Sequence, residues 1–318
     1  MKLVVAFLCY NQSSAPYLPE FLDSLEISLS KVKAEILVLA GDNSDQAPYT
    51  NNLLIDQYNR RASFPVRLLS FASNLGFAVA YNNLIAVAHQ EGADYFLMLN
   101  PDMLVGEEMV KELVSALSIN KELAVVCPKI YRWDFANRIK TNILDSCGII
   151  MRPGLRFSDL GQGELDRGQY DRANILGPSG AAACFRLDAL RTIKEDDGYF
   201  DANFFMYKED CDLAYRFYRA GLKSCLVPQA TAYHDRSAAS KGGLVSTWLD
   251  WRRRNPLTRS WSFVNQHRLF IKHWSREGLK SRFLIVVQVV FLGIFSLILA
   301  HFLLKSYAQI WRIYRGLD

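Results

Sequence analysis

Over residues 1 to about 125, short apolar runs alternate with amphipathic stretches, and no other feature of the sequence constrains the fold as strongly. The apolar runs have the length of β-strands, and the stretches between them have the apolar spacing of helices. Parallel strands need a crossover connection, which is usually a helix. The alternation therefore predicts an α/β fold with a mainly parallel sheet and flanking helices. The predicted strands are 3–10, 35–41, 66–71 and 95–99, and the predicted helices include 18–29 and 83–92.

Polar segments follow three of these predicted strands. "YNQSS" follows the first strand, "GDNSDQ" the second, and "NPD", which ends at Asp102, the fourth. Asn-Pro is also a common turn opener, so Asp102 taken alone could be a solvated turn residue. In parallel sheets, however, ligands bind beyond the carboxyl ends of the strands, where these three segments would share one edge. We therefore expect a binding site at that edge.

The second half of the chain changes character. Residues 125 to about 175 are rich in Gly, Arg and Asp and favour antiparallel strands and loops over helices. "GPSGAAACFRLDAL" follows, and its small residues, including Gly180, allow a backbone to approach a ligand or another strand closely. "EDCDLAYRFYRAGL" has helical spacing with Glu209 and Asp210 at its start, and "KSCLVPQATAYH" is predicted to be the last strand, ending near His234.

Asp102 and His234 are candidate ligands for a divalent cation. Mg²⁺ and Mn²⁺ are often held by one or two carboxylates together with the oxygens of a bound phosphate, so a single Asp at a strand end can suffice. His234 could complete the coordination sphere, more readily with Mn²⁺ than with Mg²⁺. The alternative is a surface histidine whose hydrogen bonds are satisfied by neighbouring groups, and the sequence leaves both interpretations open.

Glu209 and Asp210 are candidates for a general base. Acidic residues are also favoured at a helix start for structural reasons, because the helix dipole stabilises them there. The dipole lowers a carboxyl pKa, so a base at this position needs burial or a nearby like charge such as Asp212 to offset it. The apolar segment 204–207 directly before the pair could supply the burial.

Several other chemistries are not supported by the sequence. No GxGxxG follows the first strand, and neither a GxxxxGK[ST] phosphate loop nor a GxSxG nucleophile elbow is present. The six cysteines contain no CxxC pair, which is typical of a chain in a reducing cytosol rather than of a zinc or disulfide framework. The short apolar run at the N-terminus lacks a small-residue cleavage site and is interpreted as the first strand.

The C-terminal region differs in charge from the rest. Residues 1–240 contain 24 Lys and Arg against 29 Asp and Glu, whereas 241–318 contain 13 against 3. This region also holds an uncharged run, 283–304, which is long enough to cross a bilayer, and a mixture of aromatic and basic residues at 248–274. Basic residues on both flanks of the run suit anionic lipid headgroups better than nucleic acid. The alternative is an internal helix that covers the sheet or a subunit interface.

Seven motifs in order resemble the family 2 inverting glycosyltransferases, and most closely the rhamnosyltransferase-like enzymes of bacterial surface-polysaccharide synthesis. The resemblance runs from Lys2 to about Ser237. Any one motif is weak, but the ordered set, with "GYFD" followed by "YKEDCDL", is specific. The motifs are "YNQ", "GDNSD", "NLGFAVAYNN", "LNPD", "GPSGAAACFR", "GYFDANFFMYKEDCDLAYRFYRAG" and "YH".

The resemblance implies a GT-A fold and a role for each matching residue. It implies that Asp102 and His234 bind Mg²⁺ or Mn²⁺, that Asp210 is the catalytic base, and that Glu209 orients the base or the acceptor. The residues implied to bind the nucleotide sugar are Tyr10, Asn11, Asp42, Asn74, Gly76, Asn83, Asn100 and Gly180. Asn100 stands where the family's Asp-x-Asp motif usually begins, and Ala40-Gly41 replaces a more usual Val-Val before Asp42, which puts the nucleotide contact of Asp42 in question.

The predicted organisation is a GT-A catalytic domain at 1–240 and basic, hydrophobic, membrane-associated helices at 241–318. Within the first, 1–125 would bind the nucleotide sugar and 126–240 the acceptor. The expected function is transfer of a sugar, with rhamnose as the first candidate, from a nucleoside diphosphate donor to a lipid-linked (polyprenyl) saccharide at the cytoplasmic face of the membrane. No nucleic acid partner is expected, and a homodimer is left open. The alternatives are a non-catalytic, membrane-tethered sugar-nucleotide-binding module and a sugar nucleotidyltransferase.

Overall fold

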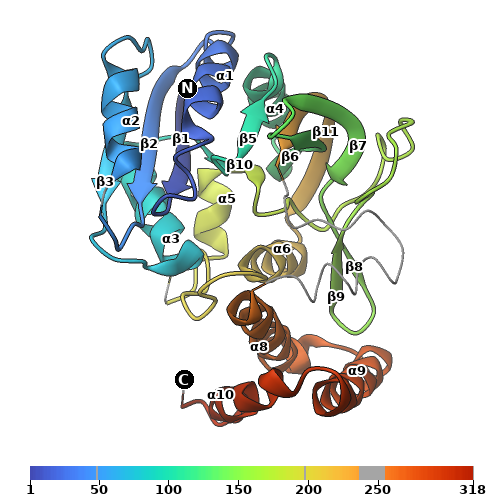
Figure 1. The fold of residues 1–318 in the computed structure, drawn as a ribbon. Coiled ribbons are helices and arrows are strands. Elements are labelled where there is room, and N and C mark those ends of the chain that lie inside the picture. The colour runs from blue at the N-terminus through green and yellow to red at the C-terminus, as the bar shows by residue number, and fades with distance from the viewer. Residues whose placement is uncertain (48, 197, 236–254, 318) are drawn as a thin grey trace.

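The computed structural model describes residues 1–47, 49–196, 198–235 and 255–317. A curved central sheet carries helices on both faces, and the C-terminal helices lie beyond helix α6 at one end of the molecule (Figure 1). The predicted division near residue 240, and the part of the aromatic and basic mixture before residue 255, fall outside the described residues.

Among the described residues, the main sheet has nine strands and is mainly parallel, as the sequence predicts. Its order is β3-β2-β1-β4-β10-β6-β11-β5, with β7 paired to β6, and β8 and β9 form a separate hairpin. β10 runs antiparallel to both neighbours, and β5 runs antiparallel to β11. The strands are β1 (Lys2–Cys9), β2 (Glu35–Asp42), β3 (Val66–Ser70), β4 (Tyr95–Leu99), β5 (Met103–Val105), β6 (Leu123–Asp134), β7 (Ile139–Ser146), β8 (Ile149–Arg152), β9 (Arg156–Asp159), β10 (Ala182–Arg186) and β11 (Lys223–His234).

The helices flank this sheet and then continue into the C-terminal region. They are α1 (Leu18–Leu29), α2 (Thr50–Asn59), α3 (Gly76–Gln90), α4 (Met109–Ile119), α5 (Leu187–Thr192), α6 (Glu209–Arg219), α8 (Pro256–His273), α9 (Leu279–Ile298) and α10 (Ser306–Tyr314). Two short 3₁₀ turns, η1 (Trp274–Arg276) and η2 (His301–Lys305), separate the last three helices.

The predicted elements form where the apolar pattern is strong. α1 begins and ends where the pattern predicts, and β4 is buried along its whole length. α3 begins seven residues earlier than predicted, and α2 occupies a segment that reads as polar. α2 is missed because only Asn51, Ile55 and Tyr58 of its side chains are buried, which gives a weak helical signal.

The C-terminal helix α8 packs on α6 through two apolar clusters. In one, Leu269 of α8 lies with Phe204 and Cys211. In the other, Phe270 of α8 lies with Tyr215 of α6. Each of these side chains is at least nine-tenths buried, so α8 shares a core with the segment that contains α6.

Candidate active site

The polar strand-end segments lie at one edge of the sheet. β1 pairs in parallel with both β2 and β4, and the register sets Cys9 beside Asp42 and Phe7 beside Leu99. The segments after β1 and β2 remain paired just beyond the strands, because Asn43 N–H donates to the Cys9 carbonyl over 2.9 Å. The segments that follow β1, β2 and β4 therefore emerge side by side.

Asp102 and His234 are brought together at this edge, 132 residues apart in sequence. β11 pairs with β5, which follows directly after Asp102, and the His234 Nε2 atom lies 3.2 Å from Asp102 Oδ1. The other ring nitrogen, Nδ1, lies 2.9 Å from Asp145 Oδ2. His234 and Asp145 are buried, while the Asp102 side chain is 34% exposed. The arrangement is a chain of carboxylate, imidazole and carboxylate that opens to solvent at Asp102.

The two carboxylates determine the proton affinity of His234. Burial disfavours the charged ring, but Asp102 and Asp145 outweigh burial and raise the pKa of His234 to about 10. A carboxylate on the second nitrogen of a metal-binding histidine fixes the tautomer and the ring orientation. A histidine binds a metal ion only as the neutral imidazole, so an ion at Asp102 would have to displace the proton between His234 Nε2 and that carboxylate. With that proton lost, one carboxylate and one oriented imidazole form a donor set that fits Mn²⁺ more readily than Mg²⁺. Sequence reasoning missed Asp145, which lies in the irregular second half and reaches His234 only through the pairing of β7 with β6.

Asn11 joins the end of β1 to the loop after β2. Its side-chain Nδ2 donates to Asp45 Oδ1 over 2.9 Å, and its side-chain Oδ1 accepts from the backbone N–H groups of Asp45 and Gln46. The neighbouring Tyr10 is 37% exposed at the same edge. Asn11 thus shapes the loop through bonds that its side chain makes within the protein.

Asp42 holds one free acceptor at this edge. Oδ1 accepts from Ser44 N–H over 3.0 Å, whereas Oδ2 is buried and has no hydrogen-bond partner among the described residues. A buried carboxylate oxygen without a donor is costly unless a ligand or water supplies one. Asp42 therefore fits a ligand that donates a hydrogen bond, as a nucleobase or a ribose would.

Gly76 brings the start of α3 against the loop before α6. Its φ of +76° suits glycine, and a Cβ atom there would lie 2.6 Å from Phe205. Phe77 N–H donates to the Phe205 carbonyl over 2.7 Å. Asn43, which the sequence did not single out, holds this turn: its Oδ1 accepts from Leu75 N–H over 2.8 Å, and its Nδ2 donates to Asn74. Asn74 and Gly76 are thereby placed beside the second strand end.

The structure separates the roles of Asn82 and Asn83. Asn83 is exposed on α3, and its amide donates to the Val79 carbonyl of its own helix. Asn82 instead accepts from the backbone N–H groups of Tyr199 and Phe200 over 3.0 and 2.9 Å, and it donates to the Phe200 carbonyl. Asn82 thus anchors the segment that leads to α6, which sequence reasoning did not identify.

Gly180 lies between the Asn-Pro-Asp turn and the start of α6. Its N–H donates to Asp210 Oδ2 over 2.9 Å, and Asp210 Oδ1 accepts from Cys211 N–H over 2.8 Å. The next residue, Ala181, accepts a hydrogen bond from Asn100 N–H over 2.8 Å. Two consecutive residues therefore tie Asp210 to the Asn-Pro-Asp turn that carries Asp102.

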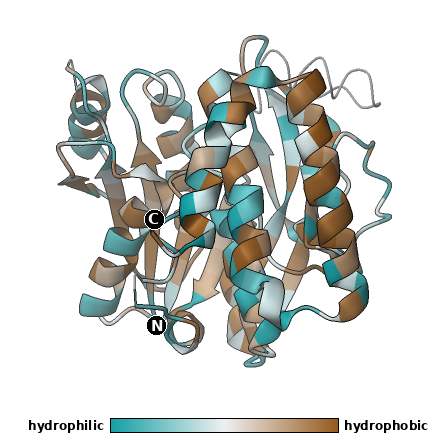
Figure 2. Cartoon of the chain, turned by 90° about the horizontal axis from the view of Figure 1, so that it is seen from below, coloured by the Kyte–Doolittle hydropathy of each residue, from teal (hydrophilic) through white to brown (hydrophobic). Residues whose placement is uncertain are grey.

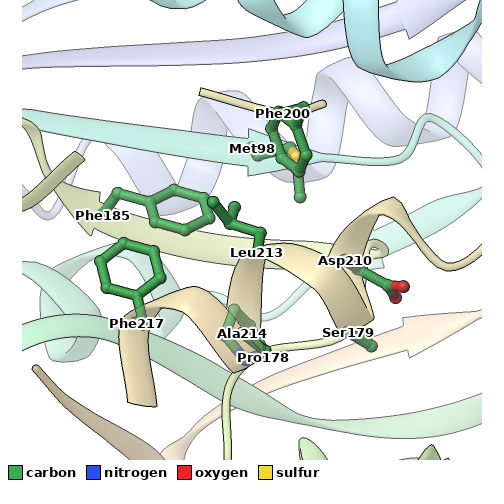
Figure 3. Close-up of a pocket in the computed structure, with 9 residues that line it drawn as sticks. All are labelled: Met98, Pro178, Ser179, Phe185, Phe200, Asp210, Leu213, Ala214 and Phe217. Carbon is green, nitrogen blue, oxygen red and sulfur yellow. The ribbon is translucent and has the colours of Figure 1, made fainter. Parts of the chain in front are cut away.

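Glu209 and Asp210 face different surroundings. Glu209 is 5% exposed, and its Oε2 atom has no hydrogen-bond partner among the described residues. Burial, and then the charge of Asp210, raise the pKa of Glu209 well above its usual value. Asp210 is partly exposed at the mouth of a small apolar pocket beneath α6, and Figure 3 shows its carboxylate pointing away from Phe185 and Phe217, which line that pocket. The side chains that line this pocket are mainly apolar, and Asp210 lies at its edge.

The turn before α6 has an unusual backbone. Tyr207 and Lys208 both have positive φ, 72° and 71°, which costs a residue with a side chain roughly 1–3 kcal/mol at each position. Asn265 of α8 is buried, and its amide donates to the carbonyls of Met206 and Tyr207 over 2.9 and 2.8 Å. α8 therefore holds the turn that presents Glu209.

A second acidic cluster, made of Glu195, Asp201 and Asp212, lies behind α6. Two cations already offset most of its negative charge. Lys272 Nζ of α8 lies 2.6 Å from Glu195, 2.7 Å from Asp201 and 3.1 Å from Asp212, and Arg216 donates to Asp212 over 2.8 Å. Burial opposes ionisation of Asp212, but hydrogen bonding to the adjacent imidazole and the neighbouring cations outweigh it and lower the pKa of Asp212. This cluster joins α8 to α6 and needs no metal ion.

Comparisons with known proteins agree with the resemblance drawn from the motifs. An N-acetylglucosaminyl-diphospho-decaprenol L-rhamnosyltransferase of Mycobacterium tuberculosis (strain CDC 1551 / Oshkosh) is 26% identical over 271 residues, which cover 74% of this chain and 78% of that protein. S. aureus TarS 1-349 matches in structure with a TM-score of 0.59 at 16% identity, over 100% of this chain and 81% of that chain. The mannosyltransferase PcManGT from Pyrobaculum calidifontis, in complex with GDP-Man and Mn²⁺, matches in structure with a TM-score of 0.53 at 14% identity. The match covers 97% of this chain and 86% of that chain.

The family model described as Glycosyl transferase family group 2 matches residues 95–314, which include the Asn-Pro-Asp turn, α6 and the C-terminal helices. The predicted GT-A architecture is confirmed by the strand order and by the structural neighbours. Because the match covers well over half of the chain, this protein belongs to glycosyl transferase family group 2.

Proposed function

We propose that this glycosyltransferase inverts the anomeric carbon of a nucleoside diphosphate sugar and uses Mg²⁺ or Mn²⁺. The observation that carries the proposal is the link through Gly180 and Ala181, which ties Asp210 to the turn that carries Asp102. Asp102 would then bind the metal ion at the leaving diphosphate, and Asp210 would accept the proton of the attacking hydroxyl. The hydrogen bonds through Gly180 and Ala181 hold the two carboxyl groups in a fixed arrangement.

The residues of this frame divide the work. When bound, the metal ion offsets the negative charge that develops on the departing diphosphate. Asp102 and His234 would hold the ion, and Asp145 would keep the His234 ring in position. Asp42, together with Tyr10, would bind the nucleoside through its unpaired Oδ2 atom.

Asp210 would accept the proton of the acceptor hydroxyl as that oxygen attacks the sugar. Its two backbone hydrogen bonds orient the carboxylate, and its partial exposure leaves room for a substrate. Glu209, which is buried and has a raised pKa, would remain protonated beside it and so would not add a second negative charge. Removal of the proton by a positioned base typically contributes about 10²–10⁴-fold to the rate.

The donor, acceptor and location follow from the relative. Its name describes rhamnosyl transfer to a diphospho-decaprenol-linked N-acetylglucosamine. For this chain we therefore propose a rhamnose donor, first as the deoxythymidine diphosphate, and a polyprenyl-linked saccharide acceptor used in cell-surface polysaccharide synthesis. Such an acceptor lies in a membrane, which agrees with the basic C-terminal region and with placement at the cytoplasmic face.

A panel of nucleotide sugars tests this proposal. Detergent-solubilised protein is incubated with Mn²⁺ and each donor, and release of nucleoside diphosphate is measured with and without a polyprenyl-diphosphate N-acetylglucosamine acceptor. We expect release from one donor, stimulated by the acceptor, and a β-to-α or α-to-β change at the transferred sugar by NMR. Retention of configuration contradicts the inverting mechanism. Donor binding without release from any donor, with or without acceptor, favours the non-catalytic binding module.

A further inference from the structure

Helix α9 has two faces of different kinds. It is the one helix in the described part of the chain that is long and apolar enough to cross a membrane, with a mean hydropathy of 2.2. Only 11% of its most apolar window is buried. The exposed side chains are all apolar over four turns, between 37% and 67% exposed: Phe283, Val286, Val287, Val289, Val290, Phe291, Ile294, Leu297 and Ile298.

The other face of α9 is attached to the protein along its length. Near its start, Ser281 Oγ accepts from Gly154 N–H over 2.9 Å, and Gln288 Nε2 donates to the Gly154 carbonyl over 2.7 Å. Ile285, between them, is buried with Phe270 of α8. These contacts seat the first half of α9 on the turn between β8 and β9 and on α8.

The end of α9 returns to the same body. Ala300 and Leu303, just after the helix, are buried in a cluster with Phe263 of α8, and Ser296 Oγ lies 3.3 Å from the Tyr307 hydroxyl of α10. A helix of 20 residues is about 30 Å long, so a spanning helix would place its far end across the bilayer from the catalytic domain. Here both ends contact α8, and α9 therefore lies along the surface of the domain (Figure 1).

We propose that α9 lies in the plane of the bilayer interface, with its exposed apolar face among the acyl chains, and does not span the membrane. Figure 2, which views the molecule from the side of the C-terminal helices, shows hydrophobic residues on the helices that face the viewer. Basic residues that suit anionic headgroups stand before α9, in its first turn and after it: Arg276, Lys280, Arg282, Lys305, Arg312 and Arg315.

The charges favour lipid over a second copy of the chain as the occupant of this face. In a two-fold dimer the same patch would face itself and bring the basic residues of both copies together, which is unfavourable. The proposal rests on the proposed membrane location of the acceptor, but it does not depend on the identity of the donor or on the base.

Its consequence is that the membrane-bound surface and the active site form one packed unit. α9 contacts α8, and Asn265 of α8 holds the turn before Glu209. The catalytic helix α6 would therefore sit at a fixed height above the headgroups, where the diphosphate of a lipid-linked acceptor is found.

Vesicle binding tests the occupant of the outer face. The full chain is sedimented with phosphatidylcholine vesicles containing phosphatidylglycerol, and the variant Val290→Glu/Ile294→Glu is compared with a matched control, Leu53→Glu/Ile119→Glu, which alters exposed apolar residues of α2 and α4. We expect at least a tenfold loss of vesicle affinity for the α9 variant alone. Equal vesicle affinity of the α9 variant and the wild type overturns the proposal. A wild-type protein that is dimeric without lipid, when the α9 variant is monomeric, overturns it as well.

Labelling tests the orientation. Single cysteines are introduced at the exposed Ser275 before α9 and the exposed Gln309 after it, and host membranes are treated with a membrane-impermeant maleimide in right-side-out and inverted vesicles. We expect both sites to react only in inverted vesicles. Reaction of the two sites from opposite sides shows a spanning helix and refutes the proposal. Donor release by the same variants is measured in parallel, so a failed transferase assignment is recognised separately.

Discussion

Glu209 and Asp210 show how two adjacent carboxyl groups acquire different properties. Helical geometry turns Glu209 into the core and leaves Asp210 at the surface beside Gly180. The Asp210 carboxylate remains partly exposed, and Glu209 resists ionisation because it is buried where solvent cannot stabilise its charge. The dipole argument from sequence, which treats the pair alike, does not distinguish them.

At this scale, Asp210→Asn is expected to lower the rate of transfer at least roughly 10²-fold while donor affinity changes little. The substitution keeps the shape of the side chain but removes the proton acceptor. Single-turnover transfer and donor titration separate the two effects. Glu209→Gln is the matched comparison: if it abolishes transfer and Asp210→Asn does not, the base has been assigned one residue too late.

Glu209→Gln is also expected to change how stability depends on pH. The raised pKa means that the folded protein holds a proton that the unfolded chain releases above about pH 4.5. Stability is therefore fully present below that pH and declines as pH rises, by up to about 1.4 kcal/mol per unit until the folded pKa is reached. In thermal unfolding from pH 5 to 9, the stability of the Gln variant relative to the wild type should increase as pH rises. Parallel curves for the two proteins would contradict the raised pKa.

Asp102→Ala is expected to abolish the metal-dependent part of donor binding, because the diphosphate would lose the ion that balances its charge. Calorimetric donor titrations with and without Mn²⁺ measure this. Asp145→Asn provides a graded comparison, since loss of a carboxylate behind a metal-binding histidine typically weakens metal affinity about 10–100-fold. Unchanged Mn²⁺ dependence in Asp102→Ala would show that the metal is held elsewhere.

At the scale of elements, α8 controls the position of α6. Besides the apolar clusters, polar contacts join them, including the Asn265 amide that donates to the carbonyls of the turn and the ion pairs of Lys272 with the acidic cluster. The turn adopts positive φ at two side-chain-bearing residues, so it needs such support to persist. Because α8 belongs to the basic C-terminal region, that region contributes to the site as well as to the surface.

Asn265→Asp is expected to lower kcat more than it raises the donor KM. The variant keeps the size of the side chain but loses both donated bonds and sets an oxygen against two carbonyls, so the turn before α6 should relax and misplace Asp210. A stability loss of about 1–3 kcal/mol is expected from the unpaired carbonyls. Asn120→Asp, at the exposed end of α4, is the control, because its side chain only accepts a hydrogen bond from the Glu122 N–H, which an aspartate can also accept. Equal changes in kcat for the two variants, or an unchanged kcat in Asn265→Asp, would contradict the positioning role of Asn265.

At the scale of the whole molecule, the C-terminal helices are both a surface and part of the core. Ile285 of α9 covers Leu155, Tyr215 and Phe270, while the opposite face of α9 is exposed. The apolar residues of this helix therefore fall into two groups, those that pack into the core and those that are exposed. Hydropathy alone does not distinguish the two groups.

Truncation after Lys280 is expected to release the protein from the membrane fraction and to preserve donor hydrolysis, since α8 and its contacts with α6 remain. Stability should fall by about 1.5–3 kcal/mol or more, because burial of Ile285 alone is worth that much. Fractionation, donor hydrolysis and thermal unfolding are compared with the full-length Val290→Glu/Ile294→Glu variant, which should leave the membrane without losing stability. An insoluble, inactive truncation would identify α9 as an indispensable core helix.

Elements whose signal is local could be predicted from the sequence. The βαβ alternation, the boundaries of α1 and β4, and the helix that begins at Glu209 all depend on spacing within one segment, where periodicity reports directly which side is buried. The ordered motifs likewise indicated the family, because several of them are the segments that directly follow a strand.

Only the tertiary structure decided the contacts between distant segments. Asp145 meets His234 across 89 residues, Asn82 rather than Asn83 holds the loop at Phe200, and Asn265 reaches the turn at Tyr207. Each depends on strand register or helix rotation, which are set by the packing of the whole core and leave no periodic trace in the sequence. The position of α9 has the same origin: its composition permits a spanning helix, and its attachment to α8 at both ends places it along the surface.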